Sequence, residues 1–210
     1  MKLSLSRIHF PVTTLGPGRR LGIWFQGCSI RCPGCISADT WNKKTPDVEI
    51  AELIEQIQPW MSKCDGFTIS GGEPFEQAEA LTELLLAIRS KSEKSILIYS
   101  GQALEQLLEH RSVKEGLLDC LVSDPFQINS LQTLPLRGSD NQRMSFLTPL
   151  GKQIFGSTSD LSTTQKRLDV MFDDDGAVWL AGIPMRGDMQ NLEKILASRG
   201  HTMKTTESKA

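Results

Sequence analysis

Apolar residues along this 210-residue chain recur as short continuous runs, separated by segments with helical spacing. Runs of strand length lie at residues 21–26, 67–70, 95–99 and 117–122. Apolar side chains at positions i, i+3, i+4 and i+7 predict helices around residues 50–57, 81–88 and 104–108. Asp47 is the expected N-cap of the first of these helices. The alternation of strand and helix predicts an α/β fold with a parallel sheet.

The pattern changes after about residue 126, where polar residues dominate up to residue 165. Two apolar runs at 168–172 and 177–183 then flank an Asp-Asp-Asp-Gly turn and predict a β-hairpin. A short helix is expected near 188–198, and the tail that follows residue 200 is expected to be mobile. We therefore expect a main domain over residues 1–146 and a small α+β extension over residues 147–210.

Each strand of the predicted parallel sheet is followed by an unusual loop. Three cysteines follow the first strand, and Gly71-Gly72-Glu73-Pro74 follows the second. Ser100-Gly101 follows the third strand, and Asp124-Pro125-Phe126 follows the fourth. Right-handed crossovers bring the carboxyl ends of parallel strands to one edge of a sheet. The four loops are therefore expected to form one site.

Charge and hydropathy exclude several classes of partner. The chain carries 23 basic and 25 acidic residues, a formal net charge of −2, which gives no electrostatic reason to expect bulk nucleic acid as a partner. No apolar run approaches the roughly 18 residues that a membrane span requires. The apolar stretch at the N-terminus is too short for a signal peptide, so we expect a cytoplasmic protein without a membrane partner.

The cysteines carry the strongest chemical signal. The chain has five, an odd number that makes a poor disulfide framework, and Cys28, Cys32 and Cys35 lie in one loop with Cys-x3-Cys-x2-Cys spacing. Three thiolates can hold three irons of a [4Fe–4S] cube and leave the fourth iron without a protein ligand. A structural zinc ion usually takes four ligands, so zinc is the weaker alternative. Cys64 and Cys120 are interpreted as small buried hydrophobic residues, and Trp24 and Phe25 as core residues.

The cysteine triplet resembles the signature of the radical S-adenosylmethionine (SAM) superfamily. In that family the open iron binds the amino and carboxylate groups of SAM, and the reduced cluster cleaves SAM to methionine and a 5′-deoxyadenosyl radical. The resemblance implies that Cys28, Cys32 and Cys35 are the cluster ligands and catalytic residues. It also implies that Gly71, Gly72 and Glu73 match the family's Gly-Gly-Glu-Pro motif, which contacts the amino group of SAM. Further SAM contacts implied by the resemblance are Gly34, Ile36, Ser70 and Ser100.

A narrower resemblance is to the activating enzymes of anaerobic ribonucleotide reductase. The similar segments are residues 16–19, 25–28, 32–35, 40–41, 121–126 and 137–143. The resemblance implies an open, partial βα barrel that generates a glycyl radical on a partner enzyme, with flavodoxin or ferredoxin as electron donor. Two departures from the family are Ser123-Asp124-Pro125-Phe126 in place of Asp-Gly-Pro-Phe, and about 60 additional C-terminal residues.

These departures leave the substrate open. One alternative is a radical SAM enzyme that modifies a small molecule, a nucleoside or a peptide. Another alternative, from a different functional class, is a non-catalytic Fe–S or zinc binding module.

Overall fold

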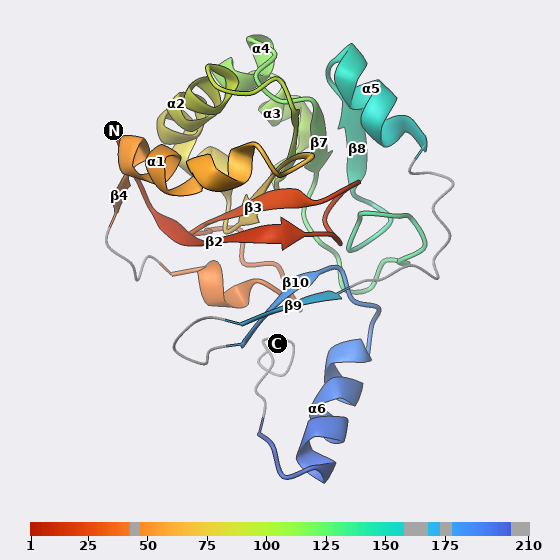
Figure 1. The fold of residues 1–210 in the computed structure, drawn as a ribbon. Helices are drawn as coiled ribbons and strands as arrows, with labels where there is room; N and C mark the ends of the chain where they lie inside the picture. Colours follow the sequence, from red (N-terminus) through yellow and green to blue (C-terminus); the bar gives the residue numbers. More distant parts are fainter. Residues whose placement is uncertain (43–46, 158–167, 173–177, 203–210) are drawn as a thin grey trace.

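The computed structural model describes residues 1–42, 47–157, 168–172 and 178–202 (Figure 1). Its main element is a six-stranded sheet in the order β2-β3-β5-β6-β7-β8. The four central strands β3, β5, β6 and β7 are parallel, and β2 and β8 pair antiparallel at the two edges. The strands are β2 (Leu5–Val12), β3 (Arg20–Phe25), β5 (Gly66–Gly71), β6 (Ser95–Tyr99), β7 (Cys120–Ser123) and β8 (Arg143–Phe146).

Helices connect the parallel strands, as the sequence predicts. The α-helices are α1 (Ile50–Met61), α2 (Ala78–Arg89), α3 (Leu104–Leu107), α4 (Arg111–Lys114), α5 (Pro149–Phe155) and α6 (Asp188–Ser198). Two short 3-10 helices lie at η1 (Ala38–Thr40) and η2 (Pro74–Gln77), and β1 (Lys2–Leu3) pairs with β4 (Val48–Glu49). The N-cap predicted for α1 is wrong, because the chain enters the helix from β4 and the N-cap is Glu49, not Asp47.

The two faces of the sheet bury different sets of side chains. Leu21, Ile23 and Phe25 of β3 pack with α1 and α2 in the largest apolar cluster. Trp24, between them in sequence, points to the opposite face, because successive strand residues alternate. Trp24 and Phe25 are 5% and 0% exposed, which confirms them as core residues. On the face of Trp24, Phe155 of α5 covers β6 and β7.

The C-terminal hairpin lies on the face of Trp24. It pairs β9 (Leu168–Phe172) with β10 (Val178–Gly182), and α6 follows, as predicted. Met171 and Ala181 pack with Trp24. The predicted turn at 173–176 and most of the tail, residues 203–210, lie outside the described residues. Within the described part of the chain, no helix has both the length and the apolar character needed to cross a bilayer.

A buried carboxylate fixes this hairpin to the main sheet. Asp169 is 5% exposed and accepts hydrogen bonds from the backbone N–H groups of Thr13 and Thr14, at 2.6 and 3.1 Å. The two threonine hydroxyls also donate to it, at 2.8 and 2.9 Å. Hydrogen bonds to a charged acceptor contribute more than neutral ones. Asp169 is therefore a polar anchor that holds the hairpin to the turn after β2.

We expect the substitution Asp169→Ala to release the hairpin. Each hydrogen bond to a charged group contributes about 1.5–3 kcal/mol, and four donors would lose their acceptor together. Hydrogen–deuterium exchange should therefore become at least about tenfold faster in the amides of β9 and β10. The amides of α2 are the internal control and should keep the wild-type rate. Unchanged exchange in the hairpin would contradict the role of Asp169.

Candidate active site

The cysteine loop follows β3 and is held by the backbone at both ends. Gly27 N–H donates to the Thr40 carbonyl at 2.7 Å, and Cys28 N–H donates to the Trp41 carbonyl at 3.0 Å. Between these points the chain makes a tight turn, with Cys35 N–H donating to the Cys32 carbonyl at 3.1 Å. Two hydrogen bonds from Ser29, through its N–H and hydroxyl, reach the Glu76 carboxylate and fix the loop to η2.

The three thiols of this loop are half-buried, and none of the five cysteines forms a disulfide. Burial raises the pKa of all three thiols, that of Cys35 to about 11. Backbone N–H groups act in the opposite direction: those of Ile30 and Arg31 lower the pKa of Cys28. N–H donors aimed at sulfur are suited to thiolate ligands of a cluster, because they stabilise the negative charge.

The donor set fits a cubic cluster. Among the described residues, no three His, Cys, Asp or Glu side chains are grouped closely enough to hold one metal ion. In a [4Fe–4S] cube each thiolate binds a different iron, so the three sulfur atoms do not converge on a single point. Three thiols on one loop, none of them in a disulfide, therefore match the number and type of ligands that such a cluster takes.

The Gly71-Gly72 pair lies against the start of the cysteine loop. Gly71 has φ +103°, and a Cβ there would come within 2.5 Å of the Phe25 carbonyl oxygen. At Gly72 a Cβ would come within 2.1 Å of the Gly27 carbonyl oxygen. Both positions therefore require glycine, since the two loops touch through their backbones. The same contact includes a hydrogen bond from Glu73 N–H to Gly27 O at 2.8 Å.

The Glu73 carboxylate is buried, 1% exposed, and joins the second loop to the third. Oε1 accepts hydrogen bonds from Phe75 N–H at 3.1 Å and from the Ser100 hydroxyl at 2.8 Å. Oε2 accepts from Gly101 N–H at 2.8 Å. Burial raises the pKa of Glu73 to about 7, while these three donors lower it. The Ser100 hydroxyl is engaged twice, because it also accepts from Gln102 N–H at 3.1 Å.

The fourth loop reaches the cluster loop as well. A hydrogen bond from the Phe126 backbone lowers the pKa of Cys32, and the ring of Phe126 lies near Gly34. Asp124 has φ +79°, a left-handed conformation. It stands where the Asp-Gly-Pro-Phe motif described above has glycine. Its carboxylate accepts two hydrogen bonds from Arg143, each at 2.7 Å. The predicted convergence of the four loops at one edge of the sheet is confirmed.

The 137–143 motif shapes this fourth loop. Asn141 donates to the Pro125 carbonyl at 2.9 Å, and Gln142 donates to the Asp124 carbonyl at 3.1 Å. Gln142 also accepts from Gly138 N–H at 2.9 Å. These polar side chains thus hold the loop after β7 in place beside the cysteines.

A cavity of about 170 Å³ lies beside Cys35. Of the predicted site residues, Gly34, Ile36 and Ser70 line this cavity together with Cys35. Gly71, Gly72, Glu73 and Ser100 are not among its lining residues. SAM contacts by all seven residues stay a prediction.

Sequence reasoning missed several residues of this cavity. Trp24, Tyr99 and Gln132 line it, and so does the segment from Leu180 to Pro184, followed by Arg186. The Tyr99 hydroxyl and Gln132 Oε1 are buried and have no hydrogen-bond partner among the described residues. Buried polar atoms are normally paired, so these two indicate a ligand with polar groups. Tyr99 directly precedes Ser100-Gly101, the loop after the third strand, which is a sequence signal for it, whereas Gln132 belongs to no motif that would have revealed it.

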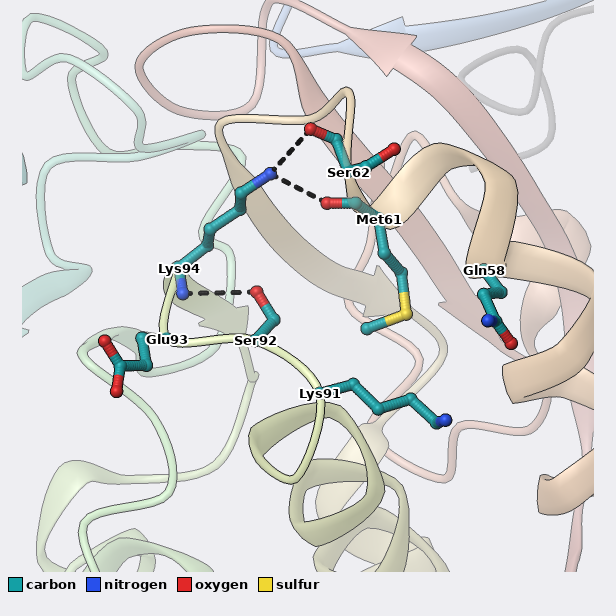
Figure 2. A pocket seen from close by; sticks show the side chains of 7 residues that line it. All are labelled: Gln58, Met61, Ser62, Lys91, Ser92, Glu93 and Lys94. Atoms are coloured by element: carbon teal, nitrogen blue, oxygen red, sulfur yellow. Dashed lines mark hydrogen bonds between the residues drawn. The ribbon is translucent and has the colours of Figure 1, made fainter.

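A larger hollow of about 890 Å³ lies at the opposite edge of the sheet, near the C-terminus of α1 (Figure 2). The Lys94 ammonium, one of two lysines that line it, donates to the carbonyl oxygens of Met61 and Ser62 at 2.7 and 3.1 Å. A third hydrogen bond goes to the Cys64 carbonyl at 2.6 Å. Lys94 thus caps the end of α1, which is a structural role.

Comparison with known proteins agrees with the chemistry of the cysteine loop. A family model described as a 4Fe-4S single cluster domain matches residues 14–145. The chain is 31% identical over 144 residues to the anaerobic ribonucleoside-triphosphate reductase-activating protein of Escherichia coli (strain K12), covering 64% of this chain and 93% of that protein. The protein of the same description from Enterobacteria phage T4 is 27% identical over 134 residues, 61% of this chain and 85% of its own length.

Similarity extends to a second kind of activating enzyme. The pyruvate formate-lyase-activating enzyme of Clostridium pasteurianum is 31% identical over 103 residues, which are 45% of this chain and 43% of that enzyme. The chain belongs to the 4Fe-4S single cluster domain family, as a radical SAM enzyme related to the anaerobic ribonucleoside-triphosphate reductase-activating proteins, with a [4Fe–4S] cluster and SAM as its cofactors.

Proposed function

We propose that this protein is a glycyl-radical activating enzyme whose partner is an anaerobic ribonucleotide reductase. The observation that carries the proposal is the meeting of four strand-end loops around Cys28, Cys32 and Cys35, in a chain whose relatives are named as activators of that reductase. When bound, the reduced cluster supplies the electron that cleaves SAM to methionine and a 5′-deoxyadenosyl radical. The proposed target is the hydrogen on the Cα of a glycine in the partner.

In this proposal each group of site residues has its own role. Cys28, Cys32 and Cys35 hold the cluster and leave one iron for SAM. The Gly71-Gly72 backbone joins the second loop to the cluster loop, and Glu73 ties that loop to Ser100 and Gly101. Gly34, Ile36 and Ser70 contact SAM from the walls of the cavity beside Cys35.

The proposal also covers the fold type, the domain bounds, the electron donor and the cellular compartment. We propose that the parallel strands and their helices form an open βα barrel of the radical SAM type, with residues 1–146 as the catalytic domain and residues 147–210 as an extension. Flavodoxin or ferredoxin would deliver the electron. A reducing cytoplasm suits a chain in which none of the five cysteines forms a disulfide.

Two measurements test the proposal. Anaerobic reconstitution should give about four irons per chain, and dithionite should then release methionine and 5′-deoxyadenosine from SAM. Addition of an anaerobic ribonucleotide reductase should produce a glycyl radical doublet in electron paramagnetic resonance. Tightly bound zinc without SAM cleavage would refute the proposed enzymatic activity and favour the alternative of a non-catalytic binding module. SAM cleavage without a radical on the reductase would favour the alternative of a small-molecule, nucleoside or peptide substrate.

A further inference from the structure

The cavity beside Cys35 has walls from two parts of the chain. One wall comes from the main sheet and its loops, through residues such as Trp24, Ser70 and Tyr99. The other comes from β10 and the segment after it, Leu180 to Pro184 and Arg186. The 4Fe-4S family model ends at residue 145, so this second wall lies entirely beyond the matched region.

The second wall is fixed on both sides of the cavity. On one side, Asp169 accepts its four hydrogen bonds from Thr13 and Thr14, and the Thr14 hydroxyl also lies 3.1 Å from the Ala181 carbonyl. The Arg7 guanidinium stacks over the ring of Trp179 at 4.3 Å, which adds a cation–π contact in the same region. The hairpin is thus tied to the strand β2 and to the turn that follows it.

On the other side, the wall is tied to the fourth loop. Gln132 Nε2 donates to the Pro184 carbonyl at 2.8 Å. The Arg186 guanidinium donates to the Gln127 carbonyl at 3.3 Å and also to the Ser130 carbonyl. The segment 182–186 therefore bridges from the hairpin to the loop that contacts Cys32.

The lining chemistry identifies the class of ligand. Ile183 and Trp24 belong to one apolar cluster and both line the cavity, which suits a flat, apolar ring system. The amide of Gln132 is oriented by Pro184, and its Oε1 has no partner among the described residues. That oxygen can accept a hydrogen bond from an amino group, and the Tyr99 hydroxyl can donate to a ring nitrogen. SAM carries these groups in its adenine.

We infer that the segment Leu180–Arg186 of the extension is a wall of the SAM-binding cavity, and that this protein needs its extension to bind SAM. The inference rests on the proposed function, because it takes SAM as the ligand of this cavity. It makes part of the extension a component of the cofactor-binding site.

The test measures SAM binding to the full-length, cluster-loaded protein by equilibrium dialysis with labelled SAM and without reductant. Ile183→Trp would fill much of the cavity of about 170 Å³ and should weaken binding by about tenfold or more. Val178→Trp, in β10 just before the segment of Ile183, is the matched control, because Val178 is 55% exposed and does not line the cavity. Its affinity should stay within about twofold of wild type.

A second variant keeps the test decisive if tryptophan prevents folding. Gln132→Leu keeps a similar volume but removes both the Pro184 hydrogen bond and the unpartnered oxygen, and should also weaken SAM binding by about tenfold. Iron content and thermal unfolding should match wild type in each variant that is compared. Wild-type SAM affinity in both Ile183→Trp and Gln132→Leu would overturn this inference and leave the proposed function intact. Absence of SAM binding by the wild-type, cluster-loaded protein would instead refute the proposed function.

Discussion

Cys32→Ala is expected to lose the cluster and, with it, SAM cleavage. Removing a partner that only orients a metal ligand costs about 10- to 100-fold in affinity, so loss of the ligand itself should cost more than about 100-fold. After anaerobic reconstitution the variant should bind less than about one iron per chain, against about four in wild type. Release of 5′-deoxyadenosine should fall below detection.

The chain contains a matched control for this experiment. Cys64 is 2% exposed, lies outside the cysteine loop, and its thiol donates to the Met61 carbonyl at 3.5 Å. Cys64→Ala should therefore keep its iron and its cleavage rate, with at most a small loss of stability. If Cys32→Ala retained four irons and cleaved SAM, Cys32 would not be a cluster ligand.

Glu73→Ala is expected to produce the second largest effect, through the loops that Glu73 connects. The substitution leaves Phe75 N–H, the Ser100 hydroxyl and Gly101 N–H without an acceptor. Each buried donor left unpaired costs about 1–3 kcal/mol, so the free energy of unfolding should fall by on the order of 3 kcal/mol or more. The measurement is chemical denaturation of the cluster-free chain. Glu79→Ala, at an exposed position of α2, is the control and should change stability by less than about 1 kcal/mol.

The carboxyl group of Glu73 also predicts a dependence of stability on pH. Its pKa rises from the ordinary value of 4.5 to about 7 because the group is buried. Between these two pH values the folded state holds a proton that the unfolded state has lost. The contribution of this group is therefore complete below pH 4.5 and is lost as the pH rises towards about 7. Glu73→Gln removes the titrating group, so the difference in unfolding free energy between wild type and this variant should change across that window.

A pH-independent difference between wild type and Glu73→Gln would show that Glu73 is ionised in both states throughout. The Glu73→Ala variant tests the hydrogen bonds between the loops separately from the ionisation of Glu73. Its loss of stability depends on the three unpaired donors, which remain at every pH.

The sequence pattern predicted the elements with the strongest local signal. The central strands β3, β5, β6 and β7 are nearly continuous apolar runs, because both of their faces are covered. Strands at the sheet edges gave no such signal. β2 mixes Arg7 and His9 with apolar residues, since most of its side chains are only half-buried. β8 and α5 lie in the polar region after residue 126 and were also not predicted.

The glycines of the second loop show a similar limit. Their sequence motif matches a SAM-binding motif, and the family resemblance implies that they approach the amino group of SAM. In the structure, a Cβ at either Gly71 or Gly72 would strike the backbone of Phe25 or Gly27. Packing of the two loops is thus sufficient to require glycine at both positions. The sequence showed that glycine was needed, and the structure shows which neighbour requires it.

The sequence by itself determined the chemistry of the cysteine loop and the order of its neighbours. Three thiols with Cys-x3-Cys-x2-Cys spacing favour a cluster with one open iron over a zinc ion, and the regular βα order places every strand-end loop at the same edge. Only the tertiary structure decided that the extension lines the cavity beside Cys35. The contact that holds it, from Asp169 to Thr13, joins residues 156 positions apart. Such a contact leaves no trace in local periodicity, because it depends on how two separately formed elements pack together.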